Sequence, residues 1–218
     1  MSESLREKIY KKIRRDITIG NLSPGERLVE IKLSEELQAS RGLIREALLQ
    51  LVSEGFLTSK KNKGISVTKL TLKQIDEIFS LRCLLEGYAV RLTAESLQKK
   101  GLAQLKTMHR ALEKATKNGS LTDWTDINIA FHEFFIENSS NNHLIQLLNG
   151  LRCRTYRYSV VIITIPGAQE TFIEDHENII KACESGDPKA AQEFMQKHME
   201  NSKIALLSHL KNFPGLLS

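Results

Sequence analysis

The sequence lacks an apolar run of the roughly 20 residues that a helix needs to cross a bilayer. It also lacks an apolar stretch near its charged start, MSESLREKIYKKIRRD, where a secretory signal would need one. Both absences lead us to expect a cytoplasmic protein that does not contact a membrane. With 41% apolar and 26% charged residues, the chain has the composition of a globular protein rather than a disordered one.

Cysteine is scarce, and the motifs of common enzyme chemistry are absent. The three cysteines are widely spaced and never form a C-x-x-C pair, so we expect ordinary thiols. There is no Gly-rich phosphate loop, G-x-S-x-G elbow or cysteine–histidine pair. His132-Glu133 begins like the zinc-protease motif H-E-x-x-H, but Ile136 stands at the fifth position. We therefore expect no enzyme; the alternatives are a metal-dependent hydrolase and a helical interaction protein without a DNA target.

The excess positive charge lies in the first third of the chain. Residues 1–70 contain 14 lysines and arginines against nine acidic residues, whereas residues 71–218 contain 17 of each. A basic segment joined to a neutral one suggests that the first part meets a polyanion. A chance distribution of so few charges is the alternative interpretation.

The first 70 residues show three helical patterns followed by a change of period. Ser40 is a plausible N-cap of the third helix, and Gly55 is a plausible end. Beyond Gly55 the apolar period changes from 3.6 to 2 around a basic turn that holds Asn62, which predicts a β-hairpin. The whole predicts a winged helix-turn-helix over 1–70. Its helices are expected over 5–19, 31–37 and 41–53, and its strands over 56–59 and 65–68.

The remainder, 71–218, contains only helical patterns. Thr71 followed by Gln74 is a capping box, and Asp187 followed by Pro188 is a strong helix start. Short connections predict antiparallel packing, so the fold class is mainly α: a winged helix-turn-helix followed by an all-α antiparallel bundle. The helices are expected over 72–98, 102–117, 121–138, 142 to the break at Pro166-Gly167, 168–184 and 188–210.

The third helix and the hairpin carry the candidate DNA-binding residues. Arg41 and Arg45 lie four residues apart on one face near the helix start, as a recognition helix in a major groove requires. Arginine there can pair with guanine or with phosphate. The hairpin tip adds Lys61 and Lys63, and Gly64 lets the backbone pass close to a duplex. A solvated helix face and a solvated turn are the alternative.

At these residues the chain resembles the winged helix of GntR-family transcription regulators, over about 19–67. The resemblance implies that Arg41 and Arg45 contact DNA and that Gly64 lies at the wing tip. The family often has an arginine at the position of Ile31, and Lys32 beside it is the candidate substitute. The matching motifs are Pro24-Gly25-x-Arg27-Leu28, Ser40-Arg41-x-x-Ile44-Arg45, Leu51-x-x-Glu54-Gly55 and Lys63-Gly64-x-x-Val67.

One recognition helix covers too few base pairs to discriminate a site within a genome. We therefore expect a homodimer on a palindromic operator in double-stranded DNA, because two-fold protein symmetry requires two-fold DNA symmetry. The neutral helical segment, with its apolar faces, is the expected dimer surface.

Three of the six histidines lie on three different predicted helices: His132, His176 and His198. Asn128 precedes His132 by four residues and so shares its helix face. Neutral imidazoles from facing helices can converge on one metal ion. From spacing alone, buried hydrogen-bonded histidines are the simpler interpretation.

From about residue 75 the chain resembles the FCD-type domain of the FadR subfamily. The resemblance implies one divalent ion, Zn, Ni, Fe or Mn, held by Asn128, His132, His176 and His198. The family has either Asp or Asn at the position of Asn128. An asparagine supplies a neutral oxygen, so weaker metal binding or another preferred ion is expected. The matching motifs are Leu81-Arg82-x-x-Leu85-Glu86-x-x-Ala89, Asn128-x-x-Phe131-His132, His176-x-x-Ile179 and Gly186-Asp187-x-x-Ala190-Ala191.

An ion with these ligands keeps its positive charge and favours a small organic acid as effector. Arg82 is a candidate second anchor for that carboxylate, with Glu86 one turn further on; a surface ion pair between the two is the alternative. Arg154 is a further candidate, as are its neighbours Arg152 and Arg157. The sequence thus predicts an effector-controlled, DNA-binding repressor.

Overall fold

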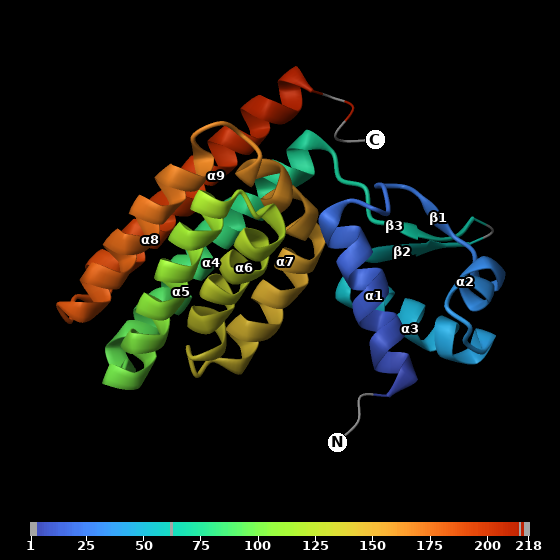
Figure 1. Cartoon of the computed structure of the whole chain (residues 1–218), viewed down its shortest axis with the longest axis horizontal. Helices are drawn as coiled ribbons and strands as arrows, with labels where there is room; N and C mark the ends of the chain where they lie inside the picture. Colours follow the sequence, from blue (N-terminus) through green and yellow to red (C-terminus); the bar gives the residue numbers. More distant parts are fainter. Residues whose placement is uncertain (1–3, 62, 214, 216–218) are drawn as a thin grey trace.

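The computed structural model describes residues 4–61, 63–213 and 215 of the chain. Figure 1 shows a small N-terminal unit beside a larger bundle of helices. The N-terminal unit contains α1 (Leu5–Ile19), β1 (Arg27–Leu28), α2 (Glu30–Glu36), α3 (Arg41–Glu54), β2 (Leu57–Lys60) and β3 (Gly64–Val67). The bundle contains α4 (Leu72–Ser96), α5 (Lys99–Asn118), α6 (Leu121–Glu137), α7 (Asn142–Ile163), α8 (Ala168–Glu184) and α9 (Pro188–Asn212).

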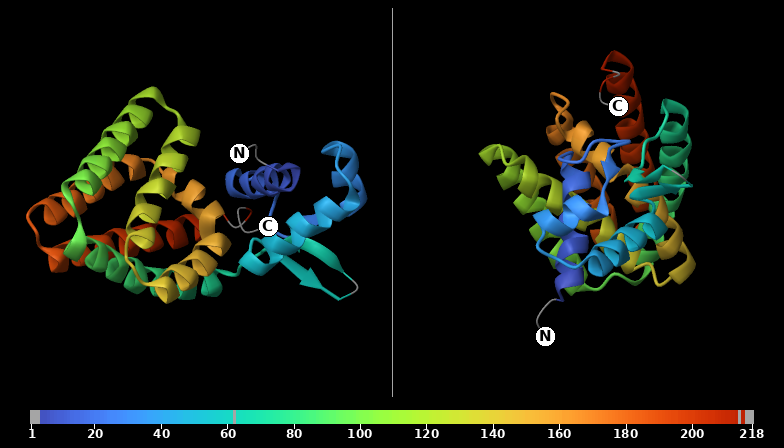
Figure 2. Two further views of the ribbon diagram at one scale, coloured as in Figure 1. Left: turned by 90° about the horizontal axis from the view of Figure 1, so that it is seen from below. Right: turned by 90° about the vertical axis from the view of Figure 1, so that its right-hand side faces the viewer.

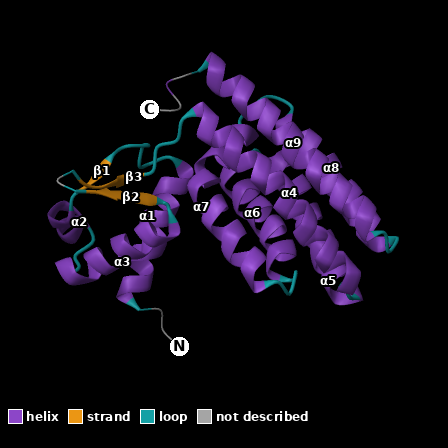
Figure 3. Cartoon of the chain, turned by 180° about the vertical axis from the view of Figure 1, so that it is seen from behind, coloured by secondary structure: helices purple, strands orange, loops and turns teal. Residues whose placement is uncertain are grey.

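The local signals that start and end the helices are confirmed. The Thr71 hydroxyl accepts a hydrogen bond from the backbone N–H of Gln74, and the Gln74 side chain accepts one from the backbone N–H of Thr71, so the capping box opens α4. Ser40 caps α3 by accepting from the backbone N–H of Leu43, and Gly55 ends it with a φ of 91°. Figure 3 shows how strongly helix dominates the chain, which confirms the expected fold class.

The wing is a three-stranded antiparallel sheet in the order β1-β3-β2. Its hairpin reaches one residue further into the turn than expected, because Lys60 pairs with Gly64. The sequence analysis misses β1, since a strand of two residues is too short to show a period. Asn62, expected in the turn, lies outside the described residues.

The bundle core takes one face from each of its helices. Helix α4 packs along α9 and also contacts α6 and α7. Large apolar side chains at 0% exposure fill the core, among them Trp124 and Phe131. Several polar side chains lie on the same faces and are buried with them: Arg82, Glu86, His132, Arg152, His176 and His198. None of the helices in the described part of the chain has the length and apolar character of a membrane span.

The two units share a packed junction at α7. Figures 1 and 3 both show α7 as the bundle helix next to α1, and Figure 2 shows the β2–β3 hairpin projecting away from the bundle. Tyr156 of α7 belongs to the apolar core of the N-terminal unit, where its ring lies parallel to that of Phe56 at 5.9 Å. Leu70, at the expected domain boundary, packs in the core of the bundle.

Candidate metal centre and DNA interface

Three histidines from three helices meet in the interior of the bundle. His132 lies on α6, His176 on α8 and His198 on α9, and each is at most 5% exposed. Their candidate ligand nitrogens all lie within 4.8 Å of one another. The structure thus brings together three residues that the sequence separates by up to 66 positions, in a cluster that could hold a metal ion.

Two of the histidines are oriented by carboxylates. His132 Nδ1 lies 2.6 Å from Glu86 Oε2, and His198 Nδ1 lies 3.1 Å from Asp175 Oδ2. A carboxylate accepts hydrogen bonds, so in the neutral form of each ring Nδ1 carries the proton and Nε2 has the free lone pair. Histidines that bind metals in proteins are usually held in this way.

Other polar atoms of the cluster are buried without a hydrogen-bond partner among the described residues. They are both ring nitrogens of His176 and the side-chain oxygen of Asn128. Leaving such atoms unsatisfied costs about 1–3 kcal/mol each, so native structures usually pair them. An ion coordinated by Asn128, by His132 and His198 and by one ring nitrogen of His176 would satisfy the Asn128 oxygen and that nitrogen. The donor set of three imidazoles and one oxygen fits Zn, Ni, Fe or Mn.

The protonation states also suit a metal. Burial lowers the pKa of His132 to about 4, although Glu86 opposes the shift. Burial likewise lowers the pKa of His176 well below its ordinary value. Burial alone would raise the pKa of Glu86, but Arg82 and His132 outweigh it and hold that pKa well below its usual range. Near pH 7 the two imidazoles are therefore neutral, the form that binds metals, and Glu86 is ionised.

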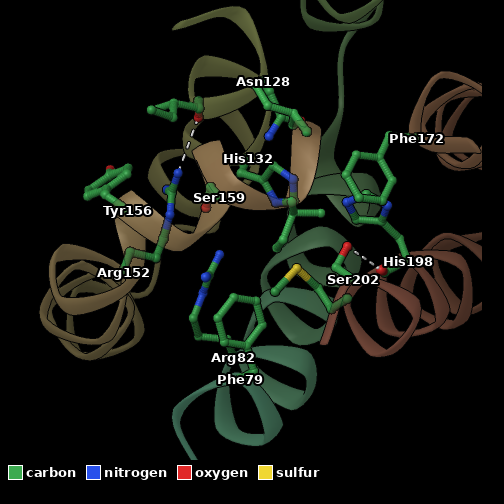
Figure 4. A pocket seen from close by; sticks show the side chains of 14 residues that line it. Phe79, Arg82, Asn128, His132, Arg152, Tyr156, Ser159, Phe172, His198 and Ser202 are labelled. Carbon is green, nitrogen blue, oxygen red and sulfur yellow. Dashed lines mark hydrogen bonds between the residues drawn. The ribbon is translucent and has the colours of Figure 1, made fainter. Parts of the chain in front are cut away.

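A small cavity adjoins the cluster (Figure 4). It has about 30 Å³ of space for the centres of water-sized molecules, enough for about two waters. A larger ligand must therefore displace some of the surrounding side chains. Five helices contribute to the lining, which includes Arg82, Asn128, His132, Arg152, Tyr156 and His198.

Arg82 and Glu86 form a buried ion pair rather than a surface pair. Arg82 Nε and Nη2 each lie 2.8 Å from Glu86 Oε1, and Arg82 Nη1 donates to Thr155 at 3.0 Å. Every nitrogen of this guanidinium thus has a partner within the chain. Glu86, expected beside the effector, faces His132 and Arg82 with its two oxygens.

Arg154, a further candidate for the effector carboxylate, does not line this cavity. Its exposed side chain packs beside Gly55 at the end of α3. The cavity-facing side of α7 instead carries Arg152 and Tyr156, one turn apart. Arg154 lies two residues beyond Arg152 and so points about 200° around the helix from it. Arg157, the other neighbour considered, lies near Gly20.

The basic residues expected at the DNA lie on the surface of the N-terminal unit. Arg41, Arg45, Lys32, Lys61, Lys63 and Gly64 are all exposed. Arg45 Nε forms an ion pair with Glu30 Oε1 at 3.0 Å, and its side chain is 66% exposed. A shallow groove between the wing and α3 is lined by Arg41, Gly64 and Arg27. Arg27 was not selected from the sequence, although it stands in the Pro24-Gly25-x-Arg27 motif.

A helix-turn-helix with a basic wing, joined to a helical bundle with a buried histidine cluster, defines a DNA-binding transcription regulator. Comparison with protein families agrees with this class: residues 5–67 match "Bacterial regulatory proteins, gntR family", and residues 77–201 match the FCD domain. The chain therefore belongs to the gntR family of bacterial regulatory proteins and carries an FCD domain. Membership of the FadR subfamily stays a prediction.

Similar proteins support the assignment along the whole chain. YdhC of Bacillus subtilis (strain 168), an uncharacterized HTH-type transcriptional regulator, is 30% identical over 93% of this chain and 89% of its own length. The regulator McbR of Escherichia coli (strain K12) is 28% identical over 94% and 93%. A probable D-xylose utilization operon transcriptional repressor of Paenarthrobacter nicotinovorans is 26% identical over 84% and 80%.

Solved structures show the same fold. E. coli McbR/YncC superposes with a TM-score of 0.83 at 26% identity, covering 96% of this chain and 100% of that one. A regulator from Rhodococcus sp. RHA1, at 19% identity, superposes with a TM-score of 0.78 over 93% and 97%. These proteins are transcription regulators and not enzymes, so the prediction of a DNA-binding regulator is confirmed and the hydrolase alternative is wrong.

The buried Arg82–Glu86 pair predicts that two glutamates on α4 contribute very different amounts to the free energy of unfolding. Glu86→Ala leaves Arg82 buried without its partner and should lower the free energy of unfolding by about 3–5 kcal/mol. Glu95 makes the same i,i+4 contact with Arg91 at the surface, so Glu95→Ala should cost about 0.5 kcal/mol or less. Urea denaturation in the presence of EDTA measures both, and equal costs would contradict this account.

Proposed function

We propose that this regulator binds a palindromic operator as a homodimer and represses transcription, and that a divalent ion with a small organic acid in the helical domain controls its DNA affinity. We place the domain boundary near residue 70. Repression is proposed because a relative, the protein of P. nicotinovorans, is named a repressor. The observation that carries the proposed control is the set of buried, unpartnered atoms of His176 and Asn128 beside the oriented His132 and His198.

The proposed ligands are Asn128, His132, His176 and His198. They come from three helices, so one ion would tie α6, α8 and α9 together in the core. When bound, the ion supplies positive charge that can attract a carboxylate. The chain's own residues hold the ligands in place, since Glu86 and Asp175 fix two of the rings.

The tightness of the cavity supports coupling to DNA. A ligand larger than about two waters has to shift the helices that line the cavity, including α4 and α7. Helix α4 follows the wing after a short link, and α7 contacts both α1 and α3. A ligand that prefers one packing of these helices must alter DNA affinity, by linkage.

Removal of the recognition-helix arginines should weaken operator binding. We expect Arg41→Ala and Arg45→Ala each to cost about 1–3 kcal/mol if they read base edges, and binding to fall steeply with added salt. Fluorescence anisotropy with duplex DNA from upstream of the protein's own gene measures this. Arg110→Ala, an exposed arginine on α5, is the control and should bind like wild type. Unchanged affinity in the Arg41→Ala/Arg45→Ala double variant would refute the proposed interface.

Metal binding should depend on the buried histidines. Chelator-treated wild type given Zn, Ni, Fe or Mn should take up one ion per chain and melt at a higher temperature, because an ion that binds the folded state stabilises it. His132→Ala and His176→Ala should lose this response, while His143→Ala, an exposed histidine, should keep it. Elemental analysis and thermal melting measure both effects. The proposal fails if wild type takes up none of these metals and its melting temperature does not change.

The expected dimer surface has a structural candidate on α4. Leu81, Leu84 and Tyr88 lie on one face at i, i+3 and i+7, and are 50%, 60% and 42% exposed. Exposed apolar side chains clustered in this way often mark an interface between proteins. A second copy of the chain, related by a two-fold axis, would cover this face and place two recognition helices on one operator.

A charge on this face should therefore separate the subunits. We expect Leu84→Glu to be monomeric at micromolar concentration in sedimentation experiments and to bind the operator more weakly, because a buried unpaired charge is costly. Leu121→Glu, at the exposed start of α6, is the control and should remain dimeric. A monomeric wild type, or a dimeric Leu84→Glu variant, would contradict the assignment.

A further inference from the structure

Arg152 is a buried arginine without a counter-ion. Its residue is 3% exposed, and no carboxylate in the described part of the chain lies within 4.0 Å of its guanidinium. Its Nη2 donates to the backbone oxygen of Ile129 at 3.3 Å, whereas its Nη1 is buried without a partner. Glu86 is close enough to interact with Arg152, but the oxygens of Glu86 already accept from Arg82 and His132.

The charge around the cavity is therefore unbalanced. Two buried guanidiniums, Arg82 and Arg152, line it, and among the residues that the structure describes Glu86 is the one buried carboxylate beside them. Arginine stays charged in proteins, and a buried charge without a partner is strongly unfavourable. The ring of Tyr156, 5.3 Å from the Arg152 guanidinium carbon, offsets only part of this cost, because a desolvated cation–π contact contributes on the order of 2 kcal/mol.

We propose that Arg152 is the residue that binds the carboxylate of the effector in this cavity, and that Tyr156 communicates its presence to the DNA-binding unit. The proposal deepens the proposed function and rests on it for the site. Figure 4 shows Arg152 and Tyr156 on one side of the cavity and His132 and Asn128 next to them. The planar guanidinium suits a carboxylate, which it can bind through two parallel hydrogen bonds. An acid at Arg152 would thus lie beside the candidate metal centre.

Tyr156 connects this cavity to the N-terminal unit. One contact of its ring is with Arg152, and its ring also stacks on Phe56. Phe56 is 1% exposed and lies between Gly55, which ends the recognition helix, and β2 of the wing. The guanidinium of Arg14 on α1 lies 5.5 Å and 5.4 Å from the Phe56 and Tyr156 rings. A shift of Tyr156 therefore displaces the junction between α3 and the wing.

An anion would change the forces on Tyr156 in two ways. It neutralises Arg152 and so weakens the attraction between this cation and the Tyr156 ring. It also needs space in a cavity with room for about two waters, so the lining side chains must move. The hydroxyl of Tyr156 donates to Glu133 at 2.6 Å and limits the directions in which the ring can go. A ligand in the cavity therefore shifts Tyr156, and the shifted ring of Tyr156 displaces Phe56.

The first experiment tests the anion site with acetate, a minimal carboxylate probe. Acetate binding is measured by calorimetry and thermal melting on metal-loaded and EDTA-treated protein. We expect Arg152→Gln and Arg152→Lys to weaken acetate binding about tenfold or more, because a charge-assisted pair of hydrogen bonds is lost or impaired. Arg154→Gln, an exposed neighbour on α7, is the matched control and should bind acetate like wild type.

The proposal is overturned if wild type binds no acetate, or if both Arg152 variants bind it as tightly as wild type. Metal content is measured on the same samples and should be unchanged in the Arg152 variants. A wild type that takes up no metal but binds acetate through Arg152 would refute the metal centre and leave this anion site standing.

The second experiment tests the coupling through the ratio of the Kd values for DNA with and without acetate. Phe56→Leu removes the stacked ring and should bring this ratio to about one while acetate still binds, because the two events become uncoupled. Tyr156→Phe keeps the stack but loses the hydrogen bond to Glu133, so it should retain part of the wild-type ratio. A variant that is only destabilised would change the Kd for DNA by the same factor with and without acetate, so the ratio would not change. A wild-type ratio in Phe56→Leu would overturn the role of the stack.

Discussion

The interior of the bundle depends on the hydrogen bonds that the Glu86 carboxylate accepts. One of its oxygens accepts from Arg82 on its own helix, and the other accepts from His132 on α6. Arg82 in turn donates to Thr155, so α4, α6 and α7 are joined by one chain of buried hydrogen bonds. Such a network is favourable only when every member has a partner. Glu86 thereby fixes the ring orientation of His132 and holds the helices around the cavity in register.

The two buried arginines differ in whether the chain itself satisfies their hydrogen bonds and charge. Arg82 is satisfied within the chain and stabilises one arrangement of helices. Arg152 retains an unpaired nitrogen and a full charge in the interior. An unsatisfied buried charge lowers the stability of the ligand-free protein and raises the gain from binding an anion. The contrast gives a physical reason for placing the proposed effector at Arg152 rather than at Arg82.

The junction between the units joins the bundle to the DNA-binding unit through one aromatic side chain. Tyr156 belongs to α7 of the bundle in sequence, yet it packs in the apolar core of the N-terminal unit. The ring therefore cannot move without disturbing Phe56, which follows the recognition helix. Close-packed interiors transmit such displacements because they have few voids to absorb them. The two units are thus linked by packing as well as by the chain connection before α4.

The sequence by itself determined the order of the elements, because caps and periodicity depend on residues only a few positions apart. Ser40, Gly55 and Thr71 mark helix ends through local hydrogen bonds or backbone conformation, and the family motifs identified the regulator class. Only the tertiary structure decided that Arg152 rather than Arg154 lines the cavity, and that Glu86 faces His132 from 46 residues away. It alone revealed the Tyr156–Phe56 stack. These contacts depend on the rotation of each packed helix, which no local pattern specifies.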